Sequence, residues 1–72
     1  MINSRSANEL TGIVKAGGSL EVDGSTLSAI QLKGIANELQ PGAYMKIFNT
    51  QEKTPLELAG IAKAKPGQVI FA

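Results

Sequence analysis

The sequence predicts a small α/β domain in which a helix–strand unit is repeated three times. Two segments match each other, each match runs into a Pro-Gly pair and an apolar stretch, and a fainter third copy precedes them. Consecutive helix–strand units give parallel strands joined by crossover helices. The 72 residues leave room for one domain. We therefore expect a single domain over residues 1–72, with a parallel three-stranded sheet and helices mainly on one face.

The repeat is clearest after residue 27. Segment 28–36 matches segment 54–62 at a shift of 26 residues (54 − 28). The Pro-Gly pairs that follow are Pro41-Gly42 and Pro66-Gly67, and the apolar stretches are 44–48 and 69–71. In repeat architectures of this kind each unit buries its apolar side against its neighbours.

The first third of the chain allows two interpretations. Segment 6–16 shares the Leu-x-Gly-Ile spacing at a shift of 22 residues (28 − 6), and Gly17-Gly18 and a short strand pattern follow it. Alternatively, residues 9–16 form a strand and Gly17-Gly18 a hairpin turn, because Thr11, Ile13 and Val14 favour strands. That alternative would change the order of elements to ββαβαβ. The helical interpretation gives units over approximately 6–24, 28–49 and 54–72.

Each unit carries a signal for the start of a helix. Ser6, Ser28 and Thr54 are followed three residues later by Glu9, Gln31 and Glu57. This is the capping-box spacing, in which each side chain satisfies a free backbone donor of the first turn. We expect the Pro-Gly pairs to end the helices, because proline breaks the helical ladder and glycine accepts a left-handed turn.

Every predicted helix combines an apolar stripe with a glycine. In the second unit the stripe consists of Leu32, Ile35, Ala36 and Leu39, at helical spacing. The glycines are Gly12, Gly34 and Gly60, and each lowers stability by up to about 1 kcal/mol relative to alanine. Because glycine recurs in every unit, we expect it to allow close approach of a helix or strand. A ligand that contacts the backbone is the alternative.

Alternation along the predicted strands assigns their side chains to two faces. Leu20, Val22, Met45, Ile47, Val69 and Phe71 would face the helices and form the core. Glu21, Tyr44, Lys46, Phe48, Gln68 and Ile70 would face away. The apolar residues of the second set cannot be covered by the helices, and an exposed patch of this kind usually marks an interface.

The exposed patch and the last strand predict a non-enzymatic protein-interaction or self-association module. The candidate interface residues are Tyr44, Lys46, Phe48 and Ile70. Segment 68–72 has no charge, so it can pair along its edge with another strand. The expected partner is a second copy of this chain, in a homo-oligomer, or another protein. Alternatively, the first segment folds over the patch and buries it.

The unit length and layout resemble the topology of leucine-rich repeats. The Leu-x-x-Leu-x-Leu-x-x-Asn signature of that family is absent, because Met45-x-Ile47-x-Asn49 places the asparagine differently. The resemblance therefore concerns layout alone and implies no function.

The composition excludes most enzyme chemistry. Cys and His are absent, which removes disulfides, the usual zinc ligands, thiol nucleophiles and imidazole bases. Asp23 is the only aspartate, and with Glu21 it fits a solvated strand face better than a catalytic pair. We expect no enzyme activity, no metal and no cofactor.

Charge and hydropathy bear on location and partners. The formal net charge of +1 with interspersed signs argues against duplex DNA or an anionic membrane as the dominant partner. No apolar run approaches the roughly 20 residues of a bilayer span, and the polar segment 1–8 does not resemble a signal peptide. We expect a soluble cytoplasmic protein without a membrane partner.

Two further functions stay open. Tyr44, Phe48 and Lys46 could form a stacking platform for single-stranded nucleic acid, which the near-neutral charge disfavours. A small anionic ligand could bind beyond the carboxyl ends of the strands, near helix N-termini. The residues at that end are Asp23, Ser25, Thr26, Asn49 and Thr50, in loops without a phosphate-binding motif.

Overall fold

The computed structural model describes residues 6–72, which contain three α-helices alternating with three strands. In chain order the elements are α1 (Ala7–Lys15), β1 (Leu20–Asp23), the short 3-10 turn η1 (Gly24–Thr26), α2 (Ala29–Asn37), β2 (Met45–Phe48), α3 (Pro55–Ala64) and β3 (Val69–Phe71). The strands form one parallel sheet in the order β1-β2-β3. The predicted α/β fold is confirmed, and the alternative ββαβαβ order is wrong.

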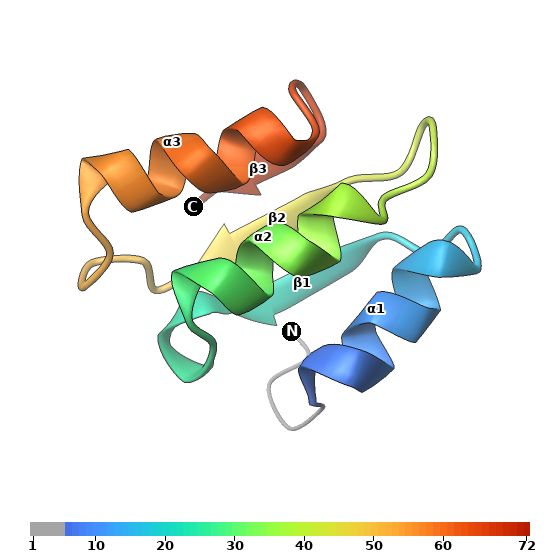
Figure 1. Cartoon of the computed structure of the whole chain (residues 1–72), viewed down its shortest axis with the longest axis horizontal. Helices are drawn as coiled ribbons and strands as arrows, with labels where there is room; N and C mark the ends of the chain where they lie inside the picture. Colours follow the sequence, from blue (N-terminus) through green and yellow to red (C-terminus); the bar gives the residue numbers. More distant parts are fainter. Residues whose placement is uncertain (1–5) are drawn as a thin grey trace.

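The helices and the sheet form two layers. α2 contacts α1 on one side and α3 on the other. Figure 1 shows the three helices side by side over the same face of the sheet. Leu20 pairs with Met45, and Met45 pairs with Val69, so the three strands begin level with one another. The outer strands β1 and β3 are the edges of the sheet.

All three capping boxes form, which explains why the first segment is a helix. In the first unit the Ser6 hydroxyl accepts from the Glu9 N–H at 3.2 Å, and the Glu9 carboxylate accepts from the Ser6 N–H at 3.0 Å. The same pair of bonds joins Ser28 to Gln31 and Thr54 to Glu57. These local bonds outweigh the strand propensity of the β-branched residues in α1, and the helix predicted in the first segment is confirmed.

The helices end differently from the prediction in one unit. α3 ends at Ala64, close to its Pro-Gly pair, but α2 ends at Asn37, four residues before Pro41. Bonds of the 3-10 type, Glu38 N–H to Ile35 O and Leu39 N–H to Ala36 O, both 3.1 Å, close the last turn. Leu39 therefore lies beyond the helix, although it is as buried as predicted.

The mid-helix glycines do not serve close packing, and that prediction is wrong. A Cβ added to Gly12, Gly34 or Gly60 would meet no neighbouring atom within 4 Å. The helical period explains this, because Gly34 lies about 200° around α2 from the buried Leu32. The glycines therefore face outward from the helix layer.

The core lies between the two layers and is entirely apolar in the described residues. Its members are Leu10, Val14, Leu20, Val22, Leu32, Ile35, Ala36, Leu39, Ala43, Met45, Ile47 and Ile61. The predicted assignment of strand residues to the core face is confirmed for β1 and β2. On β3, Val69 and Phe71 pack against the core but are only half-buried.

Candidate interaction surface

The sheet face opposite the helices carries the side chains predicted to point away from the core. Along β1 and β2, buried residues alternate with more exposed ones, as a strand requires. Ile70 is 45% exposed and Tyr44 is 40% exposed, whereas Phe48 and Lys46 are half-buried. We call Tyr44, Lys46, Phe48 and Ile70 the open face.

Strand β2 places a charge at the centre of the open face. Lys46 lies between Glu21 of β1 and Ile70 of β3 in the sheet register. The Lys46 ammonium lies 5.4 Å from the centroid of the Phe48 ring, a distance at which the ring face attracts a cation. The aliphatic stem of the lysine thus extends the apolar surface while its charge stays at the ring.

Hydrogen bonds fix Tyr44 of the open face and the neighbouring Gln68. The Tyr44 N–H donates to the Ser19 hydroxyl at 3.0 Å, which ties the start of β2 to the start of β1. The Gln68 amide donates to the carbonyls of Gln40 at 2.9 Å and Ala43 at 2.7 Å. Gln68 therefore clamps the loop before β2 instead of contributing a free side chain to the surface.

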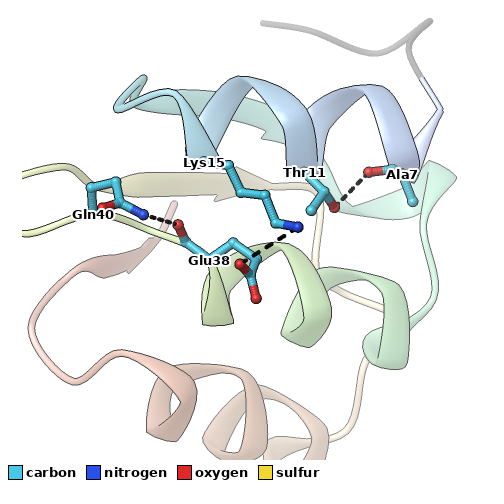
Figure 2. Close-up of polar contacts among 5 residues, drawn as sticks. All are labelled: Ala7, Thr11, Lys15, Glu38 and Gln40. Carbon is cyan, nitrogen blue, oxygen red and sulfur yellow. Dashed lines mark hydrogen bonds and ion pairs between the residues drawn. The ribbon is translucent and has the colours of Figure 1, made fainter.

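The first segment does not cover the open face. Helix α1 packs beside α2 in the helix layer and places Leu10 and Val14 in the core. The Lys15 ammonium lies 4.0 Å from the Glu38 carboxylate across this pair of helices (Figure 2). The alternative in which this segment buries the patch is wrong for residues 6–16.

The outer edge of β3 has free backbone groups. The Gln68 carbonyl accepts a hydrogen bond from β2 at 2.8 Å, and the Ala72 N–H donates one to β2 at 2.9 Å. Because successive residues direct their backbone groups to opposite sides of a strand, Val69 and Phe71 direct theirs outward. No strand within residues 6–72 pairs with this edge.

Two of the other polar residues predicted at the carboxyl ends of the strands, Ser25 and Asn49, donate to the Asp23 carboxylate. It accepts from the Ser25 hydroxyl at 2.6 Å, the Ser25 N–H at 2.9 Å and the Asn49 side-chain amide at 3.2 Å. These hydrogen bonds, those from Ser25 foremost, hold the pKa of Asp23 below its ordinary value of 3.8. The cluster joins the loop after β1 to the loop after β2.

Thr26 and Lys53 at this end also form hydrogen bonds. The Thr26 hydroxyl donates to the Asp23 carbonyl at 2.9 Å, and Thr50 lies close to Gly24. The Lys53 ammonium donates to the Gly24 carbonyl at 2.8 Å. The side-chain donors of Ser25, Thr26, Asn49 and Lys53 already bind a carboxylate or a carbonyl, so the arrangement is suited to anchoring loops.

Sequence reasoning missed the two most exposed large apolar side chains. Ile30 is 84% exposed and Leu56 is 83% exposed, each in the first turn of its helix. They occupy the same position of the repeat (56 − 30 = 26), which could have revealed them as a pair. They lie in the helix layer, so they do not extend the open face.

No family model, curated protein or solved structure matches this chain. Within residues 6–72, no helix has the length and apolar character needed to cross a bilayer. In the same part of the chain, acidic side chains nowhere gather in threes as a cation site would require. The function therefore has to be argued from the surface itself.

Proposed function

We propose that this chain is a non-enzymatic self-association module that pairs with a second copy of itself through the open face. The observation that carries the proposal is the exposure of Tyr44 and Ile70, at 40% and 45%, on the same side of the sheet as Phe48. Removing such side chains from water contributes about 25 cal/mol for each Å² buried. The cytoplasmic location expected from the sequence stays a prediction.

The charges on this side of the sheet suit a pair of identical copies. In a two-fold pair the same patch contacts itself, so it must be self-complementary. Lys46 and Glu21 are neighbours in the sheet register. A two-fold rotation can therefore bring the lysine of each copy to the glutamate of the other while the apolar side chains meet.

The alternative functions have less support. A base that stacks on Phe48 would compete with the Lys46 ammonium, which already lies over the ring. An anionic ligand beyond the strand ends would meet the Asp23 carboxylate, which is negatively charged at neutral pH because its pKa lies below 3.8. We therefore rank nucleic acid and small anions below a second copy.

Analytical ultracentrifugation tests the proposal. We expect the wild-type chain to sediment above monomer mass at micromolar concentration. Phe48→Glu should give monomers, because an unpaired charge buried in an apolar interface is unfavourable by several kcal/mol. Leu56→Glu is the matched control, since it adds the same charge to an exposed apolar residue of the helix layer. The control should sediment like the wild type.

Other outcomes point elsewhere. A folded, monomeric wild type whose behaviour Phe48→Glu does not change would show that the open face is no interface between copies. A monomeric wild type that binds single-stranded oligonucleotides in a salt-sensitive way would favour nucleic acid, and Lys46→Glu should then weaken binding more than Ile70→Ala. Should Phe48→Glu lose cooperative melting, Ile70→Glu at the more exposed residue repeats the test.

A further inference from the structure

Corresponding residues of the three helices differ in burial according to their place in the repeat. Ile13, Ile35 and Ile61 occupy the same position, one residue after the helix glycine. Ile35 and Ile61 are each 1% exposed, whereas Ile13 is 36% exposed. Ile13 belongs to the first unit, which has no preceding unit in residues 6–72. This position therefore faces the preceding unit.

At the next position of the repeat, the third unit rather than the first has the more exposed side chain. Val14 and Ala36 are fully buried, but Ala62 of the third unit is only half-buried. Adjacent helix residues lie about 100° apart around the axis, so this position faces the other side. Leu58 is likewise half-buried although its counterpart Leu32 is 0% exposed. Within residues 6–72 no following unit covers Leu58 or Ala62.

Strand β3 lies on the same side of the molecule and is also only partly covered. Its inward-facing residues, Val69 and Phe71, are half-buried, whereas their partners in β2 are 0% exposed. The same two residues direct their backbone groups to the open edge. We call Leu58, Ala62, Val69 and Phe71 the trailing end, and Ile13 with the outer edge of β1 the leading end.

We propose that copies of this chain stack head to tail, with the leading end of one copy covering the trailing end of the next. This inference rests on the proposed self-association, since the partner is again this chain, but it uses different residues. The contact already occurs twice within one copy, where the second unit covers the first and the third covers the second. A second copy supplies the same helix–strand unit that the trailing end lacks.

The register and polarity of the strands support this partner. The Leu20 N–H donates to the Tyr44 carbonyl, just before β2, at 3.0 Å, so Glu21 and Asp23 direct their backbone groups outward from β1. If β1 of a second copy lies parallel beside β3, Leu20 is next to Val69 and Val22 is next to Phe71. The two rows of core-facing apolar side chains that cross the sheet would then continue from one copy into the next.

Head-to-tail contact has a consequence that a two-fold pair lacks. A surface that binds a different surface of the next copy leaves both ends of every open assembly free, so growth does not stop at a dimer unless a ring closes. One short strand and one short helix give a contact at or below about 1,200 Å², the range of weak association. We therefore expect stacking to require higher concentrations than pairing through the open face.

The test uses the Phe48→Glu chain at about 1 mM, so that pairing through the open face is absent. Its mean mass should rise with concentration past that of a dimer. Adding Ile13→Glu blocks the leading end, and adding Ala62→Glu blocks the trailing end. Both sites are partly exposed in one copy, so both variants should fold.

Mixing the two blocked variants distinguishes head-to-tail contact from every symmetric pair. Each variant alone should be monomeric, because a head-to-tail contact needs one leading end and one trailing end, and all copies of the variant have the same end blocked. The mixture should give a one-to-one complex of twice the monomer mass, since one intact end remains on each. In an NMR spectrum of the labelled Ile13→Glu partner, the amide signals of Val69 and Phe71 should shift on mixing.

Three results would overturn the inference. Dimers of the Ile13→Glu variant alone would mean that trailing ends pair with each other. A monomeric mixture, or complexes without shifts in β3, would mean that the two ends do not bind. Ala62→Lys repeats the test if Ala62→Glu does not melt cooperatively. Because Phe48→Glu is present throughout, these results are independent of whether the open face pairs at micromolar concentration.

Discussion

Helices α2 and α3 have closely similar sequences but differ in how much of their apolar side is buried. In α2 the residues Leu32, Ile35 and Ala36 are all fully buried, whereas in α3 only Ile61 is. The difference lies in the neighbours, because α2 has a helix on both sides and α3 has one. In repeat proteins stability comes largely from the contacts between units. Similar helix sequences in this chain should therefore contribute different amounts to the free energy of unfolding.

The largest expected effect is the contrast between two leucines at the same repeat position. Leu32→Ala should lower the free energy of unfolding by about 2–5 kcal/mol, because it leaves a cavity in a fully buried site. Leu58→Ala should lower it by only about 1 kcal/mol, because that side chain is already partly exposed. Urea denaturation of both variants measures the difference.

The comparison between the two units fails if the two leucine variants lose equal stability. In that case the third unit would be as well buried as the second, for example by another copy. Repeating the Leu58→Ala measurement at increasing protein concentration separates these cases. A loss that grows with concentration would show that association, rather than the single chain, buries this residue.

Alanine in place of the helix glycines should raise stability equally in every unit. Gly12→Ala, Gly34→Ala and Gly60→Ala should each raise stability by roughly 0.5–1 kcal/mol, because the added methyl group meets no neighbour. Each kcal/mol corresponds to a rise of about 4–8 °C in the melting temperature of a domain this size. Thermal melts of the three variants therefore separate helix propensity, which is local, from burial, which depends on neighbours.

Gly24 provides the opposite control. A Cβ at this residue would lie 2.9 Å from the Phe48 carbonyl oxygen, which is backbone and cannot move aside. Gly24→Ala should therefore destabilise the chain, by about 1–3 kcal/mol as for other overpacked sites. Destabilisation by alanine at Gly34 as well would show that the helix glycines have a contact partner that a single copy lacks.

Local sequence signals were sufficient for the elements and for the two faces of the sheet. The capping boxes of Ser6, Ser28 and Thr54 marked all three helix starts, and alternation placed Tyr44, Phe48 and Ile70 outside the core. The failed predictions depended on angular position around a helix or on how a helix closes its last turn. The surroundings of Gly34 are one example, and the early end of α2 at Asn37 is another.

The candidate site was only partly predictable for the same reason. Exposure of the open face followed from the strand period together with helices on one side. The Asp23–Asn49 hydrogen bond joins residues 26 positions apart, so no local pattern reveals it. The half-burial of Val69 and Phe71 arises because no following unit in the described residues covers β3, and neither residue type encodes that absence.

The smallest expected effect concerns the loop contact between the first and second units. Because the folded pKa of Asp23 is lowered, the carboxylate contributes stability above its ordinary value of 3.8. That contribution should disappear as the pH falls through the lowered folded pKa. Asp23→Asn cannot titrate, so the difference in unfolding free energy between wild type and variant should shrink on acidification from about pH 6 to about pH 2. Ser25→Ala removes the main donor, and an NMR titration should then find the pKa of Asp23 closer to 3.8. A constant difference between wild type and Asp23→Asn across this range would show that the first and second units are not joined through this carboxylate.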